Sequence, residues 1–294
     1  MPGIHTQGLV KKQTLTEAEE TAIEQLINAC NNYEGLHMRL DVGVLRKRSG
    51  DEINDFLYYE DSILVGYLIV ESWGTKEREA TGMVHPDYRR KGIFSALLTA
   101  AKEECQQRGV QKLILVCEHT SQSGQTFVNS IGVHHEYSEH EMVLGTFRER
   151  RNFHKGLHIR QANSSDLDVI VSILATDSGN IESINQWVAK MFEEPTSRFY
   201  LATFEGKPLG CLRLDYMTDQ VGIYAFEVRL GYRGLGYGRQ MLEEAIRSVR
   251  SESQLRIMLD VETDNTNAIG LYLSCGFEIK TTYDYYRLDI KQGS

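Results

Sequence analysis

The residues that first suggest chemistry are three glycines placed between a strand-like run and a helix-like run. The apolar run Ile223–Val228 is followed by Tyr232-Arg-Gly-Leu-Gly-Tyr-Gly238 and then by an amphipathic pattern over residues 239–247. Glycines let the backbone approach a ligand closely, and a new helix adds its positive dipole end. The pattern is suited to holding a phosphate, and the expected contacts are Arg233, Gly234, Leu235, Gly236, Tyr237 and Gly238.

A second segment, about thirty residues after the loop, supports the interpretation of the loop as a phosphate-binding site. It runs Asn265-Thr-Asn-Ala-Ile-Gly-Leu-Tyr272-Leu-Ser-Cys-Gly276-Phe277. Together the two segments resemble the GNAT superfamily of acyl-CoA N-acyltransferases. The loop matches that family's pyrophosphate motif, Q/R-x-x-G-x-G/A, and the second segment matches its later motif, N-x-x-A-x-x-L-Y-x-x-x-G-F. Each motif lies where a strand, a turn and a helix are expected to follow one another.

The chain also repeats itself at an offset of 144 residues, as from Gly92 to Gly236. A period this long is the size of a whole domain, not of a solenoid repeat. The sequence therefore predicts two GNAT domains in tandem, over residues 1–148 and 153–294, joined by a charged stretch from Arg148 to Gly156. Further matched pairs are Tyr88-Arg89 with Tyr232-Arg233, Glu118 with Glu262, and Gly132 with Gly276.

The fold class follows from the order of the predicted elements. Each half reads as a strand, a helix, a hairpin, a strand before the loop, a helix and a buried strand. In the first half Thr16 is expected to cap a helix over residues 17–29. Mixed strands with helices on both faces give an α/β or α+β fold. The GNAT resemblance implies a mixed, mostly antiparallel sheet flanked by helices in each domain.

The resemblance also implies a reaction and its participants. Acetyl-CoA would be the co-substrate, and the amine would attack its thioester directly. The strand end Phe226–Val228 would bind the pantetheine arm through the backbone of Phe226 and Val228 and polarise the thioester oxygen. Tyr272 would protonate the departing thiolate, and Asn265 would cap its helix or bind the pantetheine amides. Glu227 is the candidate general base, acting directly or through water, or else it is a salt-bridged strand residue.

The first domain departs from the family pattern at three matched positions. Val128 stands where the second domain has Tyr272, and valine cannot give a proton. Ser121 replaces Asn265, and Phe94 replaces Gly238. The second domain is therefore predicted to be catalytic and the first degenerate. This division resembles mycothiol synthase, in which the C-terminal domain does the chemistry.

Composition sets limits on the partners. The net charge is −9, and no basic stripe is present, which argues against nucleic acid as a partner. No apolar run reaches the roughly 18 residues needed to span a bilayer, and no membrane association is expected. The five cysteines are scattered without a C-x-x-C pair, which is typical of a reducing cytoplasm. No metal site is expected, because the histidines near residue 135 fit no zinc spacing.

These observations favour a cytoplasmic N-acetyltransferase that acts on a primary amine of a small molecule or short peptide. It would be a monomer whose domains form a pseudo-dimer, or a homodimer. Two alternatives stay open on the sequence: a non-catalytic acyl-CoA sensor or interaction module, and a protein N-acetyltransferase. The motifs describe the donor side, so the acceptor amine is not specified.

Overall fold

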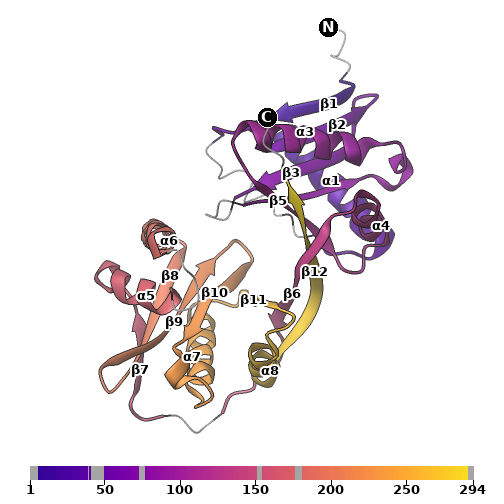
Figure 1. Ribbon diagram of the computed structural model, residues 1–294. Coiled ribbons are helices and arrows are strands. Elements are labelled where there is room, and N and C mark those ends of the chain that lie inside the picture. The colour runs from indigo at the N-terminus through magenta and orange to yellow at the C-terminus, as the bar shows by residue number, and fades with distance from the viewer. Residues whose placement is uncertain are drawn as a thin grey trace. The chain divides into compact units, whose positions relative to one another are not determined.

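The computed structural model describes residues 6–38, 40, 50–72, 77–150, 154–175 and 181–290. The chain forms two compact units. Unit 1 contains residues 1–138 and 281–294, and unit 2 contains residues 139–280. Each unit has a mixed, mostly antiparallel sheet with helices on both faces, as the sequence predicts (Figure 1).

The sheet of unit 1 has the strand order β1-β2-β3-β4-β5-β12. Its strands are β1 (Gly8–Lys12), β2 (Asp55–Glu60), β3 (Ile63–Glu71), β4 (Arg78–Val84), β5 (Lys112–Glu118) and the second part of β12 (Phe277–Asp289). Only β4 and β5 are parallel among these neighbours. Helix α1 (Glu17–Glu34) covers one face, and α3 (Ile93–Gln107) and α4 (Gln122–Ile131) cover the other. The predicted cap is present, because Thr16 and Glu19 form a capping box.

Unit 2 repeats this plan with the strand order β6-β11-β10-β9-β8-β7. The strands are β7 (Leu157–Gln161), β8 (Ser197–Phe204), β9 (Lys207–Tyr216), β10 (Gln220–Val228), β11 (Arg256–Glu262) and the second part of β6 (His134–Leu144). Strands β10 and β11 form the parallel pair. Helices α5 (Leu167–Leu174) and α6 (Ile181–Glu193) pack on one face, and α7 (Tyr237–Glu252) and α8 (Thr266–Cys275) pack on the other.

The last strand of each half of the chain pairs in the sheet of the other half. Strand β6 follows α4 in the sequence, but its residues 139–143 pair with β11 of unit 2. Strand β12 ends the chain, and its residues 283–289 pair with β5 of unit 1; in Figure 1 the yellow arrow of β12 lies next to β5. Tyr283 and Tyr285 are 2% and 3% exposed in unit 1. The expected division at residues 148 and 153 therefore leaves each half without one strand of its sheet.

No helix among the described residues is both long and apolar enough to cross a membrane. The five cysteines are free and buried.

The exchanged strands make a prediction about fragments. A fragment of residues 1–148 lacks β12 and leaves the edge of β5 unpaired, so it should aggregate or unfold without a cooperative transition. A fragment of residues 1–138 joined by a glycine–serine linker to 281–294 should be monomeric and unfold cooperatively. The restored tyrosines contribute on the order of 2 kcal/mol each when buried. Size-exclusion chromatography and thermal melts compare the two. Equal behaviour of both fragments would show that β12 is not needed by unit 1.

Candidate active site

The proposed thioester site in unit 2 is built where two parallel strands separate. Strands β10 and β11 pair from Gln220 and Arg256 up to Ile223 and Leu259. Among the described residues, no strand pairs with the rest of β10, through Val228, on that side. A strand end with an open edge offers backbone N–H and C=O groups to a ligand. The corresponding strands of unit 1 also part after Ala80 and Leu115.

Strand β10 carries a β-bulge at this point, and its counterpart β4 does not. On β10, Glu227 pairs with Cys211 of β9, whereas Tyr224 pairs with Arg213. Residues 225 and 226 therefore face the single residue Leu212. On β4, residues 81–84 pair with β3 in unbroken register. A bulge leaves its extra residue outside the ladder and increases the local twist.

The bulge also imposes an unusual backbone conformation. Ala225 has φ +47°, which L-residues other than glycine rarely adopt. Beyond it, Phe226 and Val228 belong to the core face that packs on α7 and α8, whereas Ala225 belongs to the cluster on the other face. The ring of Phe226 lies 6.4 Å from the ring of Tyr272 on α8, centroid to centroid. The structure thus brings the strand end and Tyr272 together.

Tyr272 is held in an apolar setting. It is 7% exposed and contacts Phe277 as well as Phe226. Burial and, to a smaller extent, the negative charge of Glu227 raise the pKa of Tyr272 to about 12. No described residue hydrogen-bonds to the Tyr272 hydroxyl. A phenol with this raised pKa stays protonated at neutral pH and can act as a proton donor. At the matched position in unit 1, Val128 is 4% exposed and packs in the core.

The glycine loop has the geometry that anion binding requires. Gly234 and Gly236 have φ +75° and +89°, and Gly236 begins α7 without a side-chain cap. The first helical hydrogen bond of α7 runs from the Gln240 N–H to the Gly236 carbonyl, 3.2 Å. The N–H groups of residues 237–239 come before it and lack helical partners. These donors fit the diphosphate of a CoA molecule.

The side chains of the loop have partners within unit 2 or are exposed. Arg233 donates from Nε to the Val228 carbonyl, 2.7 Å, and from Nη2 to the Glu227 carboxylate, 2.5 Å. The Arg233 side chain therefore holds the loop against the end of β10. Leu235 is 55% exposed, and Tyr237 is buried against Phe204 and Tyr232. A Cβ on Gly238 would lie 3.6 Å from Val228 and 3.8 Å from Phe226, so a side chain there would reach the strand end.

Glu227 is engaged rather than free. Its carboxylate also accepts a hydrogen bond from the N–H of Val228, 3.1 Å. To take a proton from an amine, it would have to release Arg233 or act through a water molecule. Asn265 caps α8 by accepting from the Ala268 N–H, 3.2 Å, which is one of its two expected roles.

One residue near the loop had no signal in the sequence. His154 lies within the charged stretch between the halves, and its Nε2 lies 2.7 Å from the Leu235 carbonyl. Its backbone N–H donates to Gln240, and its ring packs on Tyr237 at 4.5 Å. His154 therefore connects the segment between the two halves of the chain to the glycine loop. Among the described residues, no group of three or more His, Cys, Asp and Glu side chains could hold a metal ion.

Known proteins with similar sequences point to the same chemistry. The family model described as "Acetyltransferase (GNAT) family" matches residues 21–132 and 168–277. A mycothiol acetyltransferase of Kineococcus radiotolerans is 25% identical over 281 residues, which covers 89% of this chain and 90% of that protein. One from Geodermatophilus obscurus is 25% identical over 291 residues, covering 90% and 92%.

Solved structures share the fold across the whole chain. A GCN5-related N-acetyltransferase from Sphaerobacter thermophilus superposes with a TM-score of 0.83 at 20% identity, covering 97% of both chains. A tandem GNAT protein from the clavulanic acid biosynthesis pathway has a TM-score of 0.68 at 16% identity, covering 97% of this chain and 99% of that one. With the family model matched in both halves, this chain belongs to the acetyltransferase (GNAT) family, as a tandem acyltransferase enzyme.

Proposed function

We propose that this protein is an N-acetyltransferase that moves the acetyl group of acetyl-CoA to a primary amine of a small molecule or short peptide, and that unit 2 does the chemistry. The observation that carries the proposal is the one-residue bulge in β10. It frees backbone groups beside Tyr272 in unit 2, whereas β4 of unit 1 stays in regular pairing. The names of the mycothiol acetyltransferase relatives agree with a small-molecule acceptor.

The reaction has four parts. The loop from Gly234 to Gly238 holds the diphosphate, and the strand end through Phe226 and Val228 holds the pantetheine arm. The amine nitrogen attacks the thioester carbon, and the charge that develops on the oxygen is stabilised by backbone N–H groups at the bulge. The carbon–sulfur bond then breaks.

Three proton transfers accompany these steps. The ammonium first loses a proton to Glu227, directly or through water, so that the neutral amine can attack. The departing thiolate takes the proton of the Tyr272 hydroxyl, and the resulting phenolate takes the second proton from the attacking nitrogen. Acetyl-CoA supplies the activated acyl group, so the enzyme needs no nucleophile of its own. Cys275 agrees with this account, because it is fully buried and burial raises the pKa of its thiol.

A protein N-terminus is a second candidate acceptor. N-alpha-acetyltransferase 30 of Saccharomyces cerevisiae is 32% identical over 87 residues, which is 27% of this chain and 48% of that protein. Incubating the enzyme with acetyl-CoA and either small amines or short peptides, with free thiol release as the readout, separates the two acceptors. No thiol release with any amine would favour the non-catalytic sensor.

The bulge itself can be tested at Ala225. Ala225→Val puts a β-branched side chain where φ is positive, which should flatten the bulge and lower kcat/KM on the order of 100-fold, as for loss of an oxyanion donor. Ala225→Gly suits the positive φ and should keep activity. Thr81→Val, at the matched place in unit 1, should also keep activity. Full activity in Ala225→Val, with circular dichroism unchanged, would remove the bulge from the mechanism.

The acid can be tested at Tyr272. Tyr272→Phe keeps the packing on Phe226 and removes the proton, so kcat should fall by roughly 100-fold with little change in acetyl-CoA affinity. Because the pKa of Tyr272 is raised to about 12, its deprotonation should cause no loss of wild-type rate between pH 7 and 10. Steady-state kinetics over this range measure both effects. An unchanged kcat in the variant would assign the proton to water or to another group.

A further inference from the structure

Unit 2 buries an arginine that the proposed reaction does not use. Arg213 of β9 is 7% exposed, and burial lowers the pKa of its guanidinium. Its Nη2 donates to the Asp215 carboxylate, 2.7 Å, whereas Nε and Nη1 have no hydrogen-bond partner among the described residues. A buried ion pair with unsatisfied donors is costly, and apolar side chains in its place are often as stable or more stable.

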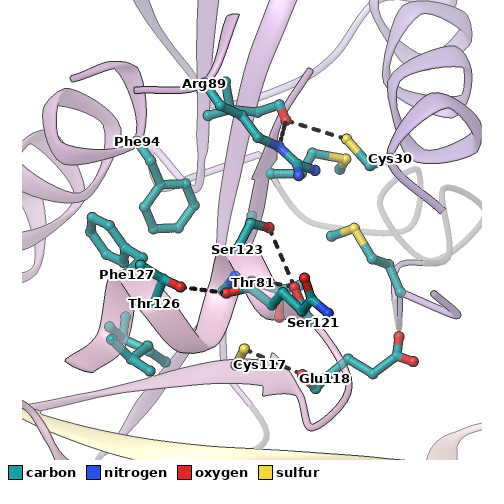
Figure 2. A pocket seen from close by; sticks show the side chains of 18 of the residues that line it. Cys30, Thr81, Arg89, Phe94, Cys117, Glu118, Ser121, Ser123, Thr126 and Phe127 are labelled. Atoms are coloured by element: carbon teal, nitrogen blue, oxygen red, sulfur yellow. Dashed lines mark hydrogen bonds between the residues drawn. The ribbon is translucent and has the colours of Figure 1, made fainter. Parts of the chain in front are cut away.

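Unit 1 shows that the same sheet can be built without this charge. Ile69, 144 positions before Arg213, is fully buried on β3 in the apolar cluster beneath α1. Ile69 pairs with Thr81 of β4 in regular register, and Thr81 lines the cavity of about 660 Å³ drawn in Figure 2. The residue 144 positions after Thr81 is Ala225, but Arg213 pairs with Tyr224, one residue earlier. The unit with the arginine has the bulge, and the unit with the isoleucine does not.

The guanidinium of Arg213 makes its other contacts with aromatic rings. Its Cζ lies 5.3 Å from the ring centroid of Tyr224 and 4.8 Å from that of Trp187 on α6. Such cation–π contacts are strongest where water is excluded. The Tyr224 ring leans back along the strand, because a Cβ on Gly222 would lie 2.3 Å from it. Arg213 therefore holds Tyr224 on the face of the sheet that packs on α5 and α6.

The alternation of side chains along β10 changes phase directly after Tyr224. Ile223 belongs to the core with α7 and α8, so Tyr224 lies on the opposite face. Ala225 lies on that opposite face as well, although consecutive residues of a regular strand alternate. Phe226 then returns to the core with α7 and α8. The core residues fix the phase on each side, and the pairing of Arg213 with Tyr224 fixes the residue at which the first phase ends.

We propose that Arg213 is a positioning residue for acetyl transfer: its contact with Tyr224 holds the last regular residue of β10 and so places the bulge at Ala225. This role rests on the proposed function of unit 2, in which backbone N–H groups at the bulge stabilise the thioester oxygen. Arg213 touches no reacting atom and moves no proton. With an isoleucine in its place, Ala225 can pair opposite position 213, as Thr81 pairs opposite Ile69, and the backbone donors are displaced.

The first test measures the strand pairing itself and needs no turnover. NMR of the full-length wild type should show cross-strand NOEs between residues 213 and 224. In Arg213→Ile these NOEs should move from Tyr224 to Ala225, which is the pairing of unit 1. Arg213→Lys keeps a cation beside the Tyr224 ring and should keep the wild-type NOEs.

The second test measures catalysis against stability, with acetyl-CoA and an amine that the wild type accepts. Arg213→Ile should lower kcat roughly tenfold or more, with the KM for acetyl-CoA within about twofold and Tm unchanged or higher. A merely structural arginine would give a lower Tm and an unchanged kcat. The control is Arg198→Met, which removes a cation–π contact with Tyr216, 4.4 Å, and an ion pair with Glu252 in the same unit and should keep kcat.

A second variant keeps the test decisive if Arg213→Ile does not fold. Tyr224→Leu removes the same contact from the other side and should lower kcat to a similar extent, and the double variant should lose no more than either single one. The proposal is overturned if the folded variants keep the wild-type NOEs, if the NOEs move while kcat stays unchanged, or if Arg198→Met lowers kcat as much. If the wild type releases no thiol with any amine, the proposed function fails, and the NOEs still decide whether Arg213 places the bulge.

Discussion

One additional residue on β10 distinguishes the strand end of unit 2 from the matched strand end of unit 1. Two residues at Ala225 and Phe226 face one residue on β9, and the strand leaves β11 at the same level. The backbone there is unpaired on one side and bulged on the other. A β-bulge costs regular pairing and places Ala225 at positive φ, so it persists only where the surroundings hold it. Here Arg233 and the packing of Phe226 on Tyr272 support it.

The exchanged strands give the repeat a physical consequence. Because β6 pairs with β11 and β12 pairs with β5, each half supplies a strand to the sheet of the other. Unit 1 then has a structural role even if it catalyses nothing, since residues 139–143 of the first half complete unit 2. At the position that matches Tyr272, Val128 packs in the apolar core of unit 1.

Local features were well predicted from the sequence, and the pairing was not. The cap at Thr16, the helix that begins after Gly236 and the cap at Asn265 are set by residues a few positions apart, so their chemistry is visible in the chain. The bulge cannot be recognised when the two halves are aligned without a gap. The extra residue in β10 is offset by one residue fewer earlier in the same half, so the alignment stays in step. The strand exchange is invisible for a related reason. Residues 134–144 and 277–289 occupy equivalent places, so either could pair in either sheet.

The side chains around the loop show the same limit. Arg233 is predicted from the sequence to contact the diphosphate, and in the structure its guanidinium forms an ion pair with Glu227, which sequence spacing does not reveal. Arg89 does the same with Glu34 in unit 1. His154 is far from the loop in sequence and reaches it only in the folded chain. The roles of these residues in the reaction stay predictions.

The central claim is that unit 2 holds the catalytic acetyl-CoA site, and calorimetric titration of two matched variants tests it most directly. Gly92 and Gly236 both start a helix at positive φ, so Gly92→Asp and Gly236→Asp carry a similar backbone strain. Only the carboxylate beside the diphosphate should distinguish them. We expect one strong acetyl-CoA site per chain, lost in Gly236→Asp and kept in Gly92→Asp. Two equal sites in the wild type, or binding that survives Gly236→Asp and disappears in Gly92→Asp, would contradict it.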